Sequence, residues 1–257
     1  MASVICHQFA YHEDNYGYLL HDPATGQTAA IDAGCSDSYL SALDKTGYQL
    51  SHILITHHHW DHTDGLAVLK KATGAEVYGP CDTKQPIAAL IDKPVSDGDE
   101  FSIGSHAIKV ITTPGHTLDM TNYYCPGADM LFSGDSLFVL GCGRLFEGDG
   151  PMMWNSLSKL SGLPEKTVIY SAHEYGLSNA AFAITIDPDN QALKERIHAI
   201  QNARRSDLPT VPSTLADELA TNPFLRADDE AIKAHLGLIG ASDEEVFSAI
   251  RRSKDNF

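Results

Sequence analysis

The stretch Thr56-His57-His58-His59-Trp60-Asp61-His62 places four imidazoles and one carboxylate within six consecutive positions. Packing alone does not explain such a run, because each buried polar ring needs a hydrogen-bond partner. Residues 52–56, with the apolar centre Ile53-Leu54-Ile55, predict a buried strand, and side chains alternate along a strand. We therefore expect His57 and His59 to project to one side, with His62 at the turn into the next element, as converging metal ligands.

Three later segments each carry one candidate ligand in a tight loop after a predicted strand. They are Thr113-Pro114-Gly115-His116-Thr117, Phe132-Ser133-Gly134-Asp135-Ser136 and Ser171-Ala172-His173-Glu174-Tyr175. Loops that follow strands frequently carry functional residues. Taken alone, His116 and His173 would be ordinary histidines, and Asp135 could be a helix cap. Their order after the histidine run favours metal ligation.

The order HxHxDH, then His, Asp and His resembles the ligand pattern of the metallo-β-lactamase superfamily. More narrowly, the chain is similar to the glyoxalase II (hydroxyacylglutathione hydrolase) family over nearly its whole length. The narrower match is carried by residues 141–148, 173–175, 210–215, 222–226 and 251–255. This resemblance implies an α+β fold, a four-layer αββα sandwich with a small C-terminal all-helical domain.

The resemblance also implies two divalent metal ions per chain, zinc first, with iron or manganese as alternatives. One ion would be held by His57, His59 and His116, the other by Asp61, His62 and His173, with Asp135 bridging both. A metal pair about 3.5–4 Å apart can share one hydroxide derived from water. Asp61 and Asp135 are the predicted catalytic residues, acting with that hydroxide.

The implied reaction is hydrolysis of the thioester of S-D-lactoylglutathione to D-lactate and glutathione, the second step of methylglyoxal detoxification. Metal binding lowers the pKa of water to about 7, and a thiol of pKa about 8.5 leaves readily as thiolate, so no strong general acid is needed. The substrate contacts that the resemblance implies are Arg144, Phe146, Tyr175, Arg251 and Lys254. Some relatives have tyrosine where this chain has Phe146, so one hydroxyl contact would be absent.

Several candidate residues have simpler interpretations. Arg251 and Lys254 could be solvated charges of the tail. Asp32 could be a turn residue, or a carboxylate that steadies a ligand histidine. Cys142 is better explained as a small residue in a crowded loop than as a nucleophile. His58 lies between two ligands, and we expect it to point away from them.

Composition limits the partners of the chain. Its 257 residues include 18 basic and 34 acidic ones, a net charge of −16, which argues against nucleic acid and against an anionic membrane surface. No apolar run approaches the roughly 20 residues that span a bilayer, and no signal peptide is evident. Five scattered cysteines without a CxxC pair favour a reduced, cytoplasmic protein, which we expect to be monomeric.

Local patterns divide the chain into a strand-rich and a helical part. Strands are predicted over residues 16–21, 28–32, 52–56, 75–78, 100–103, 107–112, 121–125, 130–133 and 168–171. Helices are predicted over residues 38–46, 66–73, 152–160, 190–205, 230–238 and 242–252. This order predicts a mixed catalytic domain over residues 1–174 and a helical glutathione-binding domain over residues 175–257.

Three other functions compete with thioester hydrolysis. The main alternative is a mononuclear iron glutathione-persulfide dioxygenase on the same fold, which holds iron with two histidines and one aspartate and lacks the long helical tail. A β-lactamase would have no use for that tail. A non-catalytic metal-binding module is disfavoured because all seven ligands are present.

Overall fold

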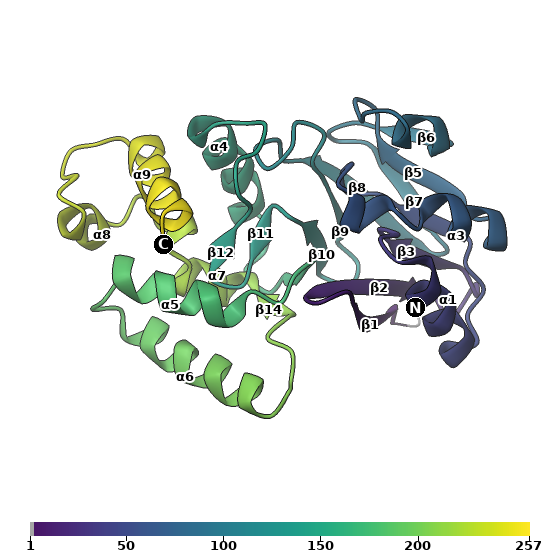
Figure 1. The fold of residues 1–257 in the computed structure, drawn as a ribbon, viewed down its shortest axis with the longest axis horizontal. Coiled ribbons are helices and arrows are strands. Elements are labelled where there is room, and N and C mark those ends of the chain that lie inside the picture. The colour runs from purple at the N-terminus through teal and green to yellow at the C-terminus, as the bar shows by residue number, and fades with distance from the viewer. Residues whose placement is uncertain (1–2) are drawn as a thin grey trace. The chain divides into compact units, whose positions relative to one another are not determined.

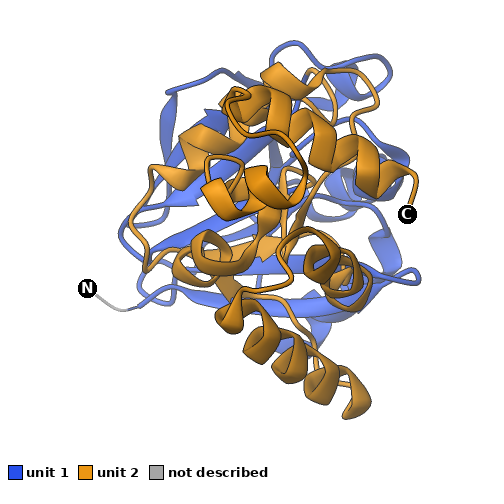
Figure 2. Cartoon of the chain, turned by 90° about the vertical axis from the view of Figure 1, so that its left-hand side faces the viewer, with its two compact units in different colours: residues 1–112, 119–134 blue, residues 113–118, 135–257 orange. Residues whose placement is uncertain are grey.

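The protein is described by a computed structural model in which residues 3–257 are placed (Figure 1). The chain divides into two compact units, coloured separately in Figure 2. Unit 1 comprises the described residues up to 112 together with residues 119–134, and unit 2 comprises residues 113–118 and 135–257. Unit 1 contains most of the strands and unit 2 most of the helices.

Unit 1 contains two groups of strands and short connecting helices. Its strands are β1 (Ile5–Tyr11), β2 (Asn15–His21), β3 (Thr28–Ile31), β4 (His52–Leu54), β5 (Glu76–Pro80), β6 (Lys93–Val95), β7 (Glu100–Ile103), β8 (His106–Thr112), β9 (Thr121–Cys125) and β10 (Met130–Gly134). Its helices are α1 (Ser36–Thr46), α2 (Trp60–Thr63), α3 (Leu66–Thr73) and the 3₁₀ turn η1 (Ile87–Leu90).

The first sheet of unit 1 has the strand order β1-β2-β3-β4-β5-β6. Strands β1 to β3 are antiparallel neighbours, whereas β3 to β6 run parallel. Parallel neighbours need a crossover connection, which α1 supplies between β3 and β4 and α3 supplies between β4 and β5. The carboxyl ends of β3 and β4 therefore lie at the same edge, which brings Asp32 next to the segment that begins at Thr56.

A buried apolar cluster joins α1 and α3 to this sheet. Tyr39 on α1, Leu66 and Leu69 on α3, and Ile53 on β4 are fully buried members of it. Each such side chain contributes about 1.5–3 kcal/mol through burial. The histidine segment therefore follows a strand that is fixed from one face by two helices.

Strands β7 to β10 form an antiparallel set in unit 1. Aromatic side chains connect this set to the first sheet. Tyr78 on β5 stacks on Phe101 of β7 with ring centroids 4.3 Å apart, and Tyr18 on β2 lies 5.7 Å from Phe132 of β10. Unit 1 thus contains a layer of helices and two layers of strands.

Unit 2 is dominated by helices. Its elements are β11 (Leu137–Phe138), β12 (Gly141–Cys142), α4 (Gly150–Ser161), β13 (Val168–Ser171), α5 (Gly176–Ile186), α6 (Gln191–Arg205), β14 (Ser213–Thr214), α7 (Leu215–Thr221), the 3₁₀ turn η2 (Pro223–Leu225), α8 (Glu230–His235) and α9 (Asp243–Asp255). Figure 1 shows α5 and α6 side by side. A capping box, in which the side chains of Ser242 and Glu245 each bond the other's backbone N–H, begins α9.

Most predicted elements are confirmed, with instructive differences. The predicted strand over residues 52–56 ends at Leu54, although Ile55 still bonds the Tyr78 carbonyl through its N–H. The predicted helix over residues 230–238 ends at His235, because the Leu238 N–H bonds back to the carbonyl of Lys233. Strands β1, β6, β11, β12 and β14 and helices α2, α5 and α7 were not predicted.

The α+β class is confirmed by this architecture. Among the residues that the structure describes, no helix is both long enough and apolar enough to span a membrane.

Candidate metal centre

The first candidate ligands follow β4 in unit 1. His57 is fully buried, and His59 is partly buried. The Nε2 atom of His57 lies 3.0 Å from Nδ1 of His59, and the two ring centroids are 4.7 Å apart. The expected projection of these imidazoles to one side is confirmed.

Asp61 and His62 lie on the short helix α2. The Oδ2 atom of Asp61 is 3.4 Å from Nε2 of His62. Asn15 donates to Asp61 Oδ2 at 3.0 Å, and the Tyr11 hydroxyl donates to the Asp61 carbonyl at 2.9 Å. A Cβ added at Gly34 would lie 1.7 Å from that same carbonyl oxygen, so only glycine fits there. Two strands and a close backbone contact therefore fix the Asp61 carboxylate.

The buried carboxylate of Asp32 forms hydrogen bonds that hold residues 56–62 in place. His62 Nδ1 lies 2.8 Å from Asp32 Oδ2, and Thr56 donates its backbone N–H and its hydroxyl to Asp32 Oδ1 at 2.8 and 3.0 Å. The Thr56 hydroxyl is also 3.0 Å from His57 Nδ1. With Nδ1 engaged in this way, Nε2 is the nitrogen of each histidine that could bind a metal ion. Of the two interpretations of Asp32, these contacts favour the carboxylate that orients a ligand histidine.

The other three candidate ligands lie in unit 2, on three separate loops. Asp135 follows β10, His173 follows β13, and His116 lies in the 113–118 segment. One oxygen of Asp135, Oδ2, is 3.3 Å from His116 Nε2, and the other, Oδ1, is 3.3 Å from His173 Nε2. All three side chains are buried. The Asp135 carboxylate thus presents one oxygen to each histidine.

The residues directly after β12, Gly143 and Arg144, fix the orientation of His116. The carbonyl of Arg144 accepts a hydrogen bond from His116 Nδ1 at 2.8 Å. A Cβ at Gly143 would lie 2.1 Å from the Asp135 carbonyl oxygen and 3.0 Å from His116 Nδ1, so the loop passes between two candidate ligands only because this residue is glycine. His173 is oriented by Tyr175, whose ring stacks on it with centroids 4.8 Å apart.

The spacing of these donor atoms fits divalent metal ions. A metal bound tetrahedrally at about 2.0–2.1 Å from imidazole nitrogen separates its ligand atoms by about 3.3–3.4 Å. The four ligand pairs given above are 3.0 to 3.4 Å apart. Imidazole and carboxylate together suit zinc, iron and manganese.

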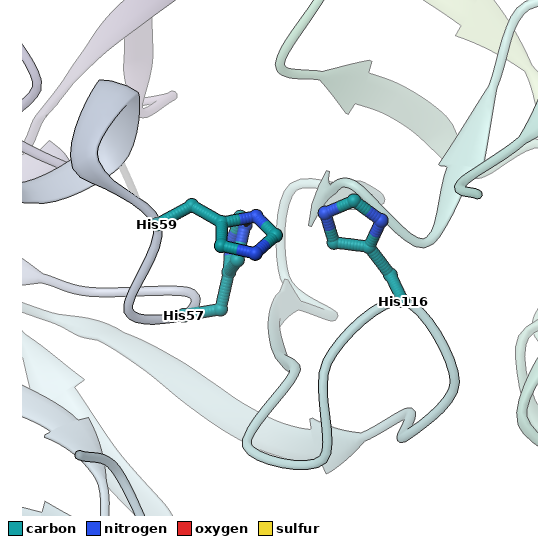
Figure 3. A group of neighbouring side chains, drawn as sticks. All are labelled: His57, His59 and His116. Atoms are coloured by element: carbon teal, nitrogen blue, oxygen red, sulfur yellow. Dashed lines mark hydrogen bonds between the residues drawn. The ribbon is translucent and has the colours of Figure 1, made fainter. Parts of the chain in front are cut away.

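The candidate ligand atoms gather into groups of three. These groups are His57, His59 and His116; His57, His62 and Asp135; and Asp61, His62 and His173. Within each group the ligand atoms lie within 4.8 Å of one another. Figure 3 shows the first group, in which three imidazoles are neighbours. All seven predicted ligands occur in these groups.

His58 has a different set of neighbours from the ligands on either side of it. Its Nδ1 lies 2.9 Å from Asp119 Oδ1, and the hydroxyl of Thr83 donates to the other Asp119 oxygen at 2.6 Å. His58, Asp119 and Glu147 make a fourth group that could hold an ion. Asp119 was not identified from the sequence, because a single aspartate in a loop carries no pattern.

The first three predicted glutathione contacts lie beside the ligands of unit 2. Phe146 is 60% exposed, and its ring centroid lies 5.3 Å from that of His116. The Arg144 guanidinium lies 6.0 Å from the Phe146 ring. Tyr175 contacts His173 and the ring of Phe138.

The two basic residues of α9 differ in their surroundings. Arg251 is buried, donates to the carbonyl of Cys142 at 3.0 Å, and lies over the Phe224 ring at 5.1 Å. Lys254 donates to the carbonyl of Ser178 at 3.1 Å, and burial, together with the Arg251 charge, lowers its pKa. Neither residue is a fully solvated tail charge.

Cys142 itself is buried beside Arg251. Burial is the main cause that raises the pKa of its thiol to about 11. The thiol is therefore protonated at neutral pH, in agreement with the interpretation of Cys142 as a small packing residue.

Two buried polar residues of α7 and the following turn hold the β11–β12 hairpin. Glu218 accepts the Leu140 N–H at 2.9 Å, and Asn222 donates to the carbonyls of Phe138 and Gly141 at 3.2 and 3.0 Å. This network was missed from the sequence, since Glu218 occurs there as an ordinary helix carboxylate. Its effect is to fix the hairpin that leads into Gly143 and Arg144.

Comparison with known proteins agrees with these observations. Residues 15–173 match the metallo-beta-lactamase superfamily, and residues 174–257 match the hydroxyacylglutathione hydrolase C-terminus. The chain is 50% identical over 250 residues to the hydroxyacylglutathione hydrolases of Brucella ovis and Brucella melitensis, with 97% of each chain covered.

Solved structures show the same fold. The crystal structure of ETHE1 from Myxococcus xanthus is similar with a TM-score of 0.69 and 26% identity, covering 96% of this chain and 90% of that one. TTHA1623, whose structure is of a di-iron-bound form, has a TM-score of 0.61 and 25% identity, covering 86% and 100%. The predicted fold, of metallo-β-lactamase type with a helical C-terminal region, is confirmed. The chain belongs to the hydroxyacylglutathione hydrolase family of the metallo-β-lactamase superfamily.

Proposed function

We propose that this protein is a hydroxyacylglutathione hydrolase that cleaves the thioester of S-D-lactoylglutathione to D-lactate and glutathione, in the detoxification of methylglyoxal. The observation that carries this proposal is the complete set of seven histidine and aspartate ligands gathered into groups, in a chain that matches proteins of that name over 97% of its length. Residues 175–257 form the glutathione-binding domain in this proposal.

The metal content we propose is two divalent ions per chain, most readily zinc. His57, His59 and His116 would hold one ion; Asp61, His62 and His173 would hold the other; and Asp135 would contact both. Its two oxygens face different histidines at 3.3 Å, so this carboxylate could contact both ions. When bound, such a metal pair supplies water of lowered pKa and polarises the thioester carbonyl.

The chain's own residues position the reactants. Asp61, held by Asn15, orients the attacking water, and Asp32 and Thr56 keep the ligand histidines in one tautomer. Departure of the glutathione thiolate needs no acid, because a thiol pKa is about 8.5. Cys142 takes no part as a nucleophile, since its pKa of about 11 keeps it protonated.

Substrate affinity comes from a local excess of positive charge in an acidic protein. Glutathione carries two carboxylates and one ammonium, so Arg144, Arg251 and Lys254 would attract it. The exposed ring of Phe146 and the Tyr175 ring would flank it. We also propose a cytoplasmic monomer. Five free cysteines support a reducing compartment, and a net charge of −16 opposes self-association.

The test is metal analysis of the purified protein beside two assays. We expect about two ions per chain, hydrolysis of S-D-lactoylglutathione, and no oxygen uptake with glutathione persulfide. Intact lactoylglutathione in the presence of the metal-loaded protein would refute the proposed activity. Oxygen uptake without thioester cleavage would assign the chain to persulfide oxidation.

A further inference from the structure

Asp255, in the last turn of α9, lies against two of the proposed substrate cations. Its Oδ1 atom is 2.8 Å from NH2 and 3.1 Å from Nε of Arg251. The same oxygen is 3.6 Å from Nε of Arg144. One carboxylate oxygen therefore faces two guanidinium groups that lie 107 positions apart in the sequence, at 144 and 251.

Helix stability does not explain an aspartate at this position. The C-terminal end of a helix carries partial negative charge, which disfavours a carboxylate in the last turn. An acidic residue four positions after a basic one is also the weaker order for a helical ion pair. Asp255 is therefore better explained by the guanidinium groups that it contacts than by α9 itself.

The two guanidinium groups are held very differently. Arg251 is 6% exposed and has two further contacts, the carbonyl of Cys142 at 3.0 Å and the ring of Phe224 at 5.1 Å. The Arg144 side chain is 60% exposed. At 3.6 Å its contact with Asp255 is long, and an exposed ion pair of this kind is weak. Arg144 can therefore change partner, whereas Arg251 is fixed.

We propose that Asp255 is an internal substitute for a carboxylate of the substrate. It occupies Arg144 until a carboxylate of the glutathione moiety replaces it, while Arg251 stays in place. This proposal rests on the proposed hydrolase function. The competition weakens the binding of substrate and of the glutathione product alike, and so makes Asp255 a residue that sets affinity and favours product release.

The experiment uses Asp255→Asn, which keeps the shape of the side chain and removes its charge. We expect the KM for S-D-lactoylglutathione and the inhibition constant of glutathione to fall together, by about two- to five-fold, the range of an exposed ion pair. The decrease should shrink at high salt. The KM of S-lactoyl-N-acetylcysteamine, a thioester without carboxylates, should not change.

Two further variants separate this exchange from a general effect of charge or folding. Glu244→Gln removes one charge from the exposed first turn of the same helix and should leave both constants unchanged. In an Arg144→Ala background, Asp255→Asn should change neither KM nor the inhibition constant. The guanidinium that loss of the Asp255 charge would release is absent there.

The outcomes are distinct. An unchanged or raised KM for lactoylglutathione in folded Asp255→Asn would overturn the exchange. A variant that fails to fold, as measured by thermal unfolding, would overturn it too. That result would mean that Asp255 supports the buried Arg251. If the unaltered protein cleaves neither thioester, the proposed hydrolase function fails instead.

Discussion

The two units present their candidate ligands in opposite ways. Unit 1 supplies four from one continuous stretch, residues 57–62, whereas unit 2 supplies three from separate loops at 116, 135 and 173. In unit 1 the ligands follow one another along an extended segment and one helical turn, and Asp32 and Asn15 of the same unit support them. In unit 2 the ligand geometry depends on distant contacts, such as the Arg144 carbonyl on His116. In a continuous stretch the backbone itself brings the ligands together, while dispersed ligands depend on every loop that positions them.

The largest effect is expected for Asp135→Asn in unit 2. An amide has one ligating oxygen instead of two and no charge, so we expect loss of one metal equivalent and a fall in hydrolysis on the order of 10³-fold. Metal analysis and initial rates measure the two effects. Asp189→Asn, at an exposed position of the same unit, is the matched control. Unchanged metal content and rate in the Asp135 variant would refute the bridging assignment.

The next effect tests how unit 1 orients its continuous stretch. Asn tolerates the positive φ of Asp32, which is 60°, so Asp32→Asn removes the charge behind His62 without backbone strain. Loss of such an orienting partner typically weakens metal binding by about 10- to 100-fold, measured by competition with a chelator.

The control for this substitution is Asp44→Asn, at an exposed position on α1, which should bind metal normally. A metal affinity for the Asp32 variant equal to that of the control would mean that the continuous stretch needs no support from Asp32.

The same contrast explains what could be predicted from the sequence. The pair His57 and His59 could be placed from strand alternation alone. His116, Asp135 and His173 could be grouped only through the resemblance to a known family, because no local pattern links three distant loops. Residues that support the ligands, such as Asn15 and Glu218, could not be predicted, since their contacts are tertiary and their residue types are common.

Missed elements have a similar cause. Helix α5 carries apolar residues on its exposed face too, with Leu177 and Ala181 exposed and Ala180 and Phe182 buried. Its sequence therefore lacks the polar face that marks an amphipathic helix. The β11–β12 hairpin has two residues per strand, too few to show alternation. It is held by Glu218 and Asn222 rather than by its own sequence.

A smaller effect tests whether unit 1 can be destabilised at a residue outside the ligand stretch without loss of metal binding. Asp22 accepts hydrogen bonds from the N–H and hydroxyl of Ser105 and from the N–H of Ala24. These bonds, the Ser105 N–H first, lower the pKa of Asp22 strongly; His106 Nε2 is 4.0 Å away. Because the folded pKa is depressed, this stabilisation is complete above the unfolded value of about 3.9 and is lost as pH falls through the folded pKa.

Asp22→Asn should therefore lower the midpoint of thermal unfolding by about 2–4 °C at pH 7. This difference between the midpoints of the variant and the unaltered protein should narrow below pH 4. Metal affinity should stay unchanged, because the ligand stretch is fixed by its own neighbours. A gap of constant size between pH 7 and pH 3 would contradict the charge-based explanation. Weakened metal binding would show that the ligand stretch also depends on the hydrogen bonds of Asp22.

The smallest effect concerns loop 141–148 of unit 2. Phe146 is 60% exposed beside His116, so a hydroxyl at its ring edge can reach a bound ligand without being buried unsatisfied. One added hydrogen bond contributes about 0.5–1.5 kcal/mol. Phe146→Tyr should therefore lower the KM for S-D-lactoylglutathione by about two- to ten-fold, with little change in kcat, measured by steady-state hydrolysis.

The carboxylate-free thioester S-lactoyl-N-acetylcysteamine serves as the control substrate for this variant. If the hydroxyl bonds the glutathione moiety, only the glutathione thioester gains affinity. Equal gains for both substrates would place the new hydroxyl beside the acyl group instead. No gain for either would mean that the ring edge of residue 146 does not reach the substrate, and that Phe146 acts only through its contact with His116.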